Sequence, residues 1–318
     1  MTAPALHWAT PLVESLSASE RLGRPVWLKL DALQPPGSFK IRGVGLACQA
    51  HAARGVRRLV SSSGGNAGIA VAYAGRKLGL AVDVVVPQTT SERARELIRQ
   101  QGARLQVHGD AWHQANEHAQ SLLGPDAAFI HPFDDPLLWQ GHATLVDELA
   151  QPPLALQPAA QAPWGASGRP AAVVLSVGGG GLYSGVVAGL RRNGWADVPV
   201  VAAETHGADA LARSLAAGAR IRLEAITSVA TSLGAPQVCE QAFALALQHP
   251  THPVVVSDAD AWDACRWLLA EHRLVVEPAC GAALAALNHL PPDLPADAPV
   301  VVVVCGGVTA TAQAVLAG

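Results

Sequence analysis

The sequence has few charged residues, no strongly basic region and no long apolar run. Only 15% of its 318 residues are charged, and the formal net charge is -3 at pH 7. This charge composition does not indicate the basic surface that is typical of nucleic-acid-binding proteins and of polybasic membrane anchors. No apolar run reaches the ~20 residues of a membrane-spanning helix, and residues 1–16 lack the charged and apolar parts of a signal peptide. We therefore expect a cytoplasmic protein that binds neither nucleic acid nor membrane, and whose partner is a small molecule or another subunit.

Cysteine is scarce, and histidine does not form a metal-binding pattern. The five cysteines are odd in number, are never spaced C-x-x-C, and lie at Cys48, Cys239, Cys265, Cys280 and Cys305. This distribution favours reduced thiols over a disulfide framework or a zinc site. Of twelve histidines, His113 and His118 are five residues apart and no H-E-x-x-H spacing occurs. A histidine-based metal site is therefore not expected.

Apolar runs rich in valine alternate with alanine-rich stretches of helical character. The expected strands are 58–62, 82–86, 127–130, 172–177, 199–203, 253–256 and 300–304. The expected helices include 66–78, 92–101, 136–149, 258–271 and 281–290. Strands that are apolar on both faces and alternate with helices predict a parallel sheet covered on both sides. The sequence therefore predicts an α/β protein.

Local signals mark several boundaries. Gly79 is expected to end one helix, and Ser91 or Thr90 to cap the next. The segment 151–170 is rich in proline, alanine and glutamine, which predicts an exposed loop or a linker between two halves. No internal repeat and no charged tail is present, so an additional regulatory domain is not expected.

The stretch Pro35–Lys40 places a lysine at the start of a predicted helix. Two prolines and a glycine form a turn, and Ser38 is a suitable N-cap residue. The positive end of the helix dipole disfavours an ammonium in the first turn, which favours a neutral, nucleophilic amine at Lys40. An ordinary capped helix with a solvated lysine fits the same six residues, and this alternative remains open from these residues alone.

Four consecutive glycines follow a predicted strand and precede a predicted helix. They lie in Ser176–Leu182, where backbone N–H groups and the helix N-terminus favour binding of an anion such as phosphate. The stretch is not a Walker loop, because no G-K-[ST] follows, and it does not have the Rossmann spacing, because Tyr183 and Ser184 occupy the third-glycine positions. The alternative is a flexible surface loop.

Three further polar stretches lie at predicted strand ends, where open α/β sheets bind ligands. The stretch 61–68, with sequence SSSGGNAG, offers hydroxyls, amides and a carboxamide for a carboxylate and a ring oxygen, or is simply a helix N-cap. Cys305 follows the valine run and is either a small core residue or a ligand-contacting thiol. Glu204 is either a solvated loop carboxylate or a cation ligand.

One cofactor, pyridoxal 5'-phosphate, uses all of these parts, because it has an aldehyde, a phosphate, a ring oxygen and a ring nitrogen. The order S-F-K-x-R-G, S-S-x-G-N-x-G, G-G-G-G-L, E-P-A-C-G-A and C-G-G resembles the fold-type-II pyridoxal-phosphate enzymes, and among them the L-serine dehydratases. The similarity covers nearly the whole chain, including 131–139 and 277–282. It implies two open, parallel-rich twisted sheets with flanking helices, as in the tryptophan synthase beta type. It also implies a large domain (1–34 and 137–318), a small inserted domain (35–136) and an active site in the cleft between them.

The resemblance also implies roles for individual residues. Lys40 forms a Schiff base with the cofactor, Phe39 packs on its ring, Asn66 binds its hydroxyl oxygen, and Cys305 faces its ring nitrogen. The phosphate is held by Gly178, Gly179, Gly180, Gly181 and Leu182. The substrate contacts are Ser62, Ser63, Gly64 and Asn66. A monovalent cation, expected to be potassium, is held by the Glu204 carboxylate and by carbonyls of Gly178, Ala208, Leu233 and Ala235. A homodimer is expected.

The implied reaction is β-elimination of L-serine to pyruvate and ammonia, and of L-threonine to 2-oxobutanoate and ammonia. A thiol at Cys305 cannot keep the ring nitrogen protonated as a carboxylate would, which favours elimination over transamination. Gly64 stands where the resembling racemases carry a serine, so D-serine is not expected as a product. The alternatives are a threonine dehydratase, a β-replacement enzyme of the cysteine synthase type, and a non-catalytic binding protein with the same fold.

Overall fold

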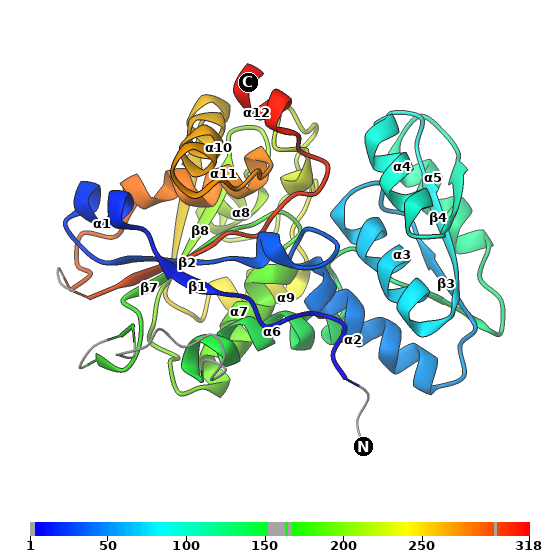
Figure 1. The fold of residues 1–318 in the computed structure, drawn as a ribbon, viewed down its shortest axis with the longest axis horizontal. Helices are drawn as coiled ribbons and strands as arrows, with labels where there is room; N and C mark the ends of the chain where they lie inside the picture. The colour runs from blue at the N-terminus through cyan, green and yellow to red at the C-terminus, as the bar shows by residue number, and fades with distance from the viewer. Residues whose placement is uncertain (1–3, 152–162, 165–166, 296–297) are drawn as a thin grey trace. The chain divides into compact units, whose positions relative to one another are not determined.

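The structure is a computed structural model that describes residues 4–151, 163–164, 167–295 and 298–318 (Figure 1). The chain divides into two compact units. Unit 1 consists of Met1–Trp8 and Gln34–His142, and unit 2 of Ala9–Leu33 and Ala143–Gly318. Each unit contains one β-sheet with helices packed beside it, which confirms the predicted α/β class.

Unit 1 is built on a four-stranded parallel sheet in the order β5-β4-β3-β6. Its strands are β3 (Arg58–Ser61), β4 (Ala81–Val86), β5 (Arg104–Val107) and β6 (Ala127–Phe129). Its helices are α2 (Lys40–Ala53), α3 (Asn66–Leu78), α4 (Glu92–Gln100) and α5 (Trp112–Ser121). Helices α3 and α5 both pack against β3 and β4, and most residues of these central strands are buried.

Unit 2 is built on a six-stranded sheet in the order β1-β2-β10-β7-β8-β9, in which only β1 is antiparallel. Its strands are β1 (Leu12–Glu14), β2 (Val26–Lys29), β7 (Ala172–Ser176), β8 (Val200–Thr205), β9 (Thr251–Val256) and β10 (Val300–Val303). Its helices are α1 (Leu16–Leu22), α7 (Gly181–Arg192), α8 (Ala210–Ala217), α9 (Glu240–Ala246), α10 (Asp258–His272), α11 (Pro278–Ala285) and α12 (Ala312–Ala317). Helix α6 spans Pro136–Ala150, and short 3-10 turns span Asp31–Leu33, Thr231–Leu233 and Ala286–His289.

The valine run of β10 lies at the centre of the unit 2 core. Val301 pairs with Trp27 of β2 on one side and with Val173 of β7 on the other, and all four residues of β10 are buried. Helices α10 and α11 lie on one side of this sheet and α7 on the other (Figure 1). A strand covered on both faces buries every side chain, which explains why β10 is continuously apolar.

Most predicted elements are confirmed, with differences at their ends. Gly79 ends α3 in the left-handed region, and the hydroxyl of Ser91 caps α4. The predicted helix 281–290 begins earlier, because Pro278 at its first position and Glu277 as N-cap start α11. Strands β1, β2 and β5 were not predicted. Most of the predicted linker 151–170 lies outside the described residues, and both of its flanks belong to unit 2.

No helix among the described residues is long and apolar enough to cross a membrane.

Candidate active site

Lys40 is the first residue of α2, as predicted, but Ser38 does not cap this helix. The N-cap residue is Phe39, whose helical backbone angles place Ser38 outside the cap position. The buried Ser38 hydroxyl has no hydrogen-bond partner within the part of the chain that the structure describes. Lys40 Nζ donates a hydrogen bond to the carbonyl oxygen of Pro132 at 2.7 Å and lies 5.1 Å from the centre of the Phe39 ring. The amine is thus held at a defined point beside an aromatic ring.

Lys40 is the only one of three lysines in the sequence with a setting suited to covalent chemistry. Lys29 is buried in an ion pair with Glu148, whose oxygen lies 2.5 Å from Nζ. Lys77 is exposed in the last turn of α3. An amine that is fixed in a buried ion pair or freely solvated is a poorer nucleophile than a partly buried one at a helix N-terminus.

The loop after β6 supplies the carbonyl that holds Lys40, and His131 shapes this loop. His131 Nδ1 accepts hydrogen bonds from the backbone N–H groups of Phe133 (3.2 Å) and Asp134 (2.7 Å). Burial lowers the pKa of His131, and Lys40 lowers it further, while Asp134 and Asp135 oppose this change. The imidazole is therefore neutral near pH 7, with its proton on Nε2.

The serine-rich loop joins β3 to α3. The Ser62 hydroxyl donates to Asn116 Oδ1 at 2.8 Å, and the Ser63 hydroxyl accepts from the backbone N–H of Gly65 at 3.3 Å. Asn66 is buried at the first position of α3. The first N–H groups of a helix have no carbonyl partner within the helix, and Gly65 provides no capping side chain. This end of α3 can therefore bind a carboxylate.

The glycine loop of unit 2 joins β7 to α7 and has no room for side chains. A Cβ on Gly178 would lie 2.9 Å from the Cα of Leu233, and one on Gly180 would lie 2.3 Å from the Cβ of Ala242. Gly180 also has a φ of +91°, which side-chain-bearing residues rarely adopt. The loop therefore presents backbone at the N-terminus of α7, an arrangement that favours binding of phosphate.

Cys305 and Glu204 lie at the carboxyl ends of the two strands on either side of β7. The Cys305 thiol is buried, and its hydrogen bond with Cys280, together with burial, holds its pKa well above the ordinary value. It is therefore a neutral thiol. Glu204 accepts hydrogen bonds from the backbone N–H groups of Leu211 (2.8 Å) and Ala212 (2.7 Å) at the start of α8. Burial nevertheless raises the pKa of Glu204 to about 8.

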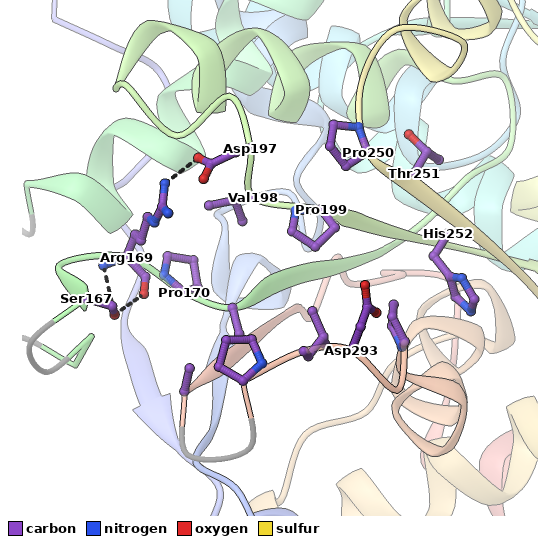
Figure 2. Close-up of a pocket in the computed structure, with 15 residues that line it drawn as sticks. Ser167, Arg169, Pro170, Asp197, Val198, Pro199, Pro250, Thr251, His252 and Asp293 are labelled. Atoms are coloured by element: carbon purple, nitrogen blue, oxygen red, sulfur yellow. Dashed lines mark hydrogen bonds and ion pairs between the residues drawn. The ribbon is translucent and has the colours of Figure 1, made fainter.

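A separate cavity of about 540 Å³ lies at the opposite ends of the same strands. Its lining includes Ala171, Pro199 and Pro250, the residues that immediately precede β7, β8 and β9. Figure 2 shows the Arg169–Asp197 ion pair on one side of this cavity. The glycine loop follows the carboxyl end of β7, so this cavity is not part of the proposed phosphate cradle.

The comparisons with known proteins agree with these observations. Residues 4–306 match the family model described as pyridoxal-phosphate dependent enzyme. The chain belongs to the pyridoxal-phosphate-dependent enzymes. It is 46% identical to the human protein named serine dehydratase-like, over 95% of this chain and 90% of that protein. It is 43% identical to human L-serine dehydratase/L-threonine deaminase, over 96% of this chain and 93% of that protein. It is similar in structure to a fungal L-serine ammonia-lyase from Rhizomucor miehei, with a TM-score of 0.89, 38% identity, and coverage of 99% and 98% of the two chains.

The residues of this pyridoxal-phosphate-dependent enzyme fit its cofactor. In unit 1, a partly buried lysine lies beside an aromatic ring, and two residues earlier the buried Ser38 hydroxyl has no hydrogen-bond partner among the described residues. In unit 2, a backbone cradle at a helix N-terminus suits a phosphate, and the neutral thiol of Cys305 lies at the end of the neighbouring strand β10. The described residues contain no cluster of three or more histidine, cysteine, aspartate or glutamate side chains that could hold a metal ion.

The sequence alone indicated no role for His131 or Pro132. Residues 131–139 contributed to the family resemblance, but a backbone carbonyl as lysine partner leaves no trace in residue identity. The one signal was the position of these residues in the fold. His131 follows β6, which is parallel to β3, and the carboxyl ends of parallel strands lie at one edge of a sheet, where ligands bind.

Proposed function

We propose that this enzyme eliminates water from L-serine, giving pyruvate and ammonia, and acts in the same way on L-threonine to give 2-oxobutanoate. The observation that carries the proposal is the Lys40 amine at the start of α2, held by Pro132 beside Phe39. The names of the similar proteins, L-serine dehydratase and L-threonine deaminase, support this choice of substrates.

We infer that the following residues bind the cofactor. Lys40 would bind it covalently, Phe39 would pack against its ring, and Asn66 would bond to its hydroxyl oxygen. The backbone of Gly178, Gly179, Gly180, Gly181 and Leu182 would hold its phosphate, and Cys305 would face its ring nitrogen. When bound, pyridoxal phosphate supplies an aldehyde for the substrate amine and a conjugated ring that withdraws electrons from Cα.

The side chains around the substrate would then act as follows. Backbone N–H groups at Ser62–Asn66 would bind the substrate carboxylate at the N-terminus of α3. The Lys40 amine would take the proton from Cα as general base, with the Pro132 carbonyl orienting it. The β-hydroxyl leaves with one proton as water. The released enamine then takes up one water and yields pyruvate and ammonia, so the atoms balance.

Cys305 directs the chemistry toward elimination. Its raised pKa keeps the thiol neutral, so it carries no negative charge that would hold a proton on the ring nitrogen. With Cys305 in this place, the bound cofactor would be a weaker electron sink, which favours loss of a β-leaving group over transamination.

We further propose a monovalent cation, potassium, beside the glycine loop. Its ligands would be the Glu204 carboxylate and the carbonyls of Gly178, Ala208, Leu233 and Ala235. The support is that Gly178 approaches Leu233 closely. In addition, two backbone N–H groups of described residues donate to the buried Glu204, and they do not offset the cost of burying its charge. Oxygen ligands suit potassium rather than a transition metal. Activity that is unchanged when potassium is replaced by a bulky organic cation would exclude a role for it.

The proposed function is tested by incubating the cofactor-loaded enzyme with L-serine and with L-threonine while following keto acid and ammonia. Equal amounts of both products from serine are expected. A faster rate on threonine would make threonine deamination the main activity. This alternative is considered because one similar protein is named L-serine dehydratase/L-threonine deaminase. No keto acid from either substrate would refute the proposal. By family, we also infer a cytoplasmic homodimer, which light scattering and cell fractionation would test.

A further inference from the structure

The side chain of Thr90 fills the space beside Gly64 in the serine-rich loop. A Cβ built on Gly64 would lie 2.6 Å from Thr90 Oγ1, 2.7 Å from its Cγ2 and 3.2 Å from its Cβ. Gly64 does not have a positive φ, so its backbone conformation does not require glycine. A side chain at position 64 would therefore require the Thr90 side chain to move.

Thr90 has no evident structural task for its hydroxyl. It lies in the turn between β4 and α4, where its backbone N–H donates to the carbonyl of Pro87 at 3.1 Å. The capping of α4 is done by Ser91, whose hydroxyl accepts from Ala94 N at 3.3 Å. Within the described part of the chain, the Thr90 hydroxyl makes no hydrogen bond, and the residue is partly exposed. Its hydroxyl is therefore available to a ligand.

The serines of the loop are less available than Thr90. The Ser62 hydroxyl donates its proton to Asn116, and the Ser63 oxygen accepts from Gly65 N. Strands β3 and β4 are parallel neighbours, so the loops that follow them lie at the same edge of the sheet. Thr90 thus brings a second loop to the N-terminus of α3, where N–H groups favour an anion.

We propose that Thr90 is a substrate-binding residue, whose hydroxyl donates a hydrogen bond to the substrate carboxylate from the position that a side chain at residue 64 would otherwise occupy. The inference rests on the proposed function in one respect, namely that the 62–66 loop receives the carboxylate of an amino acid. The carboxylate would then receive a hydroxyl donor in addition to backbone N–H groups. Because glycine at 64 leaves room for Thr90, the two residues act as a pair.

Two substitutions at Thr90 separate the effect of its hydroxyl group from the effect of its side-chain volume. Thr90→Val keeps the shape and removes the donor, so KM for L-serine and for L-threonine should rise by the same factor, about tenfold, with little change in kcat. Thr90→Ser restores the donor without the methyl group and should recover most of the lost affinity. Thr89→Val, at the exposed neighbouring residue, is the control and should leave KM unchanged.

A double-mutant cycle tests the pairing of Thr90 with Gly64. Gly64→Ala places a methyl group within 2.7 Å of Thr90 and should displace it, raising KM about as much as Thr90→Val. In a Thr90→Ala background the two closest contacts are gone and only the Cβ of residue 90, at 3.2 Å, remains, so the same alanine should raise KM little further. Additive effects of the two substitutions would contradict the pairing.

Binding is also measured without turnover, by titrating the cofactor absorbance with glycine, which has a carboxylate but no leaving group. Thr90→Val should weaken glycine binding about tenfold, and Thr90→Ser should restore it. If wild-type enzyme makes no keto acid but glycine binding still depends on Thr90, the proposed function fails and this inference stands. If the enzyme is active and Thr90→Val has wild-type KM and glycine affinity, or if Thr90→Val and Thr90→Ser are equally impaired, the inference is wrong.

Discussion

Gly180 provides the most quantitative test of the phosphate cradle. In Gly180→Ala the new methyl group would lie 2.3 Å from the Cβ of Ala242, in a backbone conformation with φ of +91°. The positive φ costs a side-chain-bearing residue about 1–2 kcal/mol, and overpacking of a core costs about 1–3 kcal/mol. The free energy of unfolding should therefore fall by about 2–5 kcal/mol unless the loop shifts to relieve the contact.

Either response should damage phosphate binding, because the loop cannot keep its shape and accommodate the methyl group. Urea unfolding, followed by circular dichroism, measures the stability. Absorbance titration with pyridoxal phosphate and with unphosphorylated pyridoxal measures the cradle, and Gly180→Ala should reduce the preference for the phosphorylated form.

The chain offers two controls for this experiment. Gly218 also has a positive φ, +65°, but a Cβ at this position would meet nothing within 4 Å, so Gly218→Ala should cost only about 1–2 kcal/mol and spare cofactor binding. Adding Ala242→Gly to Gly180→Ala removes the contact and should recover part of the loss. A Gly180→Ala enzyme with wild-type stability and wild-type phosphate preference would show that the glycine loop is not a tightly packed phosphate cradle.

Three further predictions concern other parts of the site. Potassium chloride should raise the thermal midpoint of the wild-type enzyme relative to the chloride of a bulky organic cation, and Glu204→Gln should abolish this rise. A rise that persists in Glu204→Gln would exclude Glu204 as a ligand. The pKa of His131 is lower in the folded chain than in the unfolded one, so this residue contributes stability above pH 6.5 that is lost as the pH falls. His131→Asn keeps an acceptor near Nδ1 but does not titrate, so it should reduce the acid loss of stability seen by circular dichroism, and an unchanged pH profile would contradict this. L-serine incubations should accumulate no D-serine on chiral chromatography, because Gly64 has no side chain to deliver a proton to Cα.

The parallel core and the strand-end motifs were predictable from the sequence because each depends on residues close together in the chain. The valine runs marked β4, β7 and β10, and the glycine loop marked the start of α7. Strand β5 was missed because the strands were predicted from continuous apolar runs, whereas its four residues alternate polar and apolar character at an edge of the sheet. Strand β2 was missed partly because it ends in Lys29, whose burial depends on Glu148, a partner 119 residues away.

Parts of the site could not be predicted because they depend on contacts between loops. The Pro132 carbonyl contacts Lys40, and the Thr90 side chain lies beside Gly64, although each pair is distant in sequence. Residue identity does not indicate such contacts. Ser38 has the identity of an N-cap residue, but helical backbone angles at Phe39 shift the cap by one position. Ser91 shows the opposite case, in which a local capping signal is confirmed.

The covalent role of Lys40 is the central claim, and one measurement tests it most directly. Cofactor-loaded enzyme is reduced with borohydride, digested, and analysed by peptide mass spectrometry, while Lys40→Ala is assayed in parallel for pyruvate formation from L-serine. We expect the reduced cofactor on the peptide that contains Lys40, and a loss of activity in Lys40→Ala of at least about 100-fold. Labelling of Lys29 or Lys77 instead, or an undiminished rate in Lys40→Ala with bound cofactor, would contradict this role.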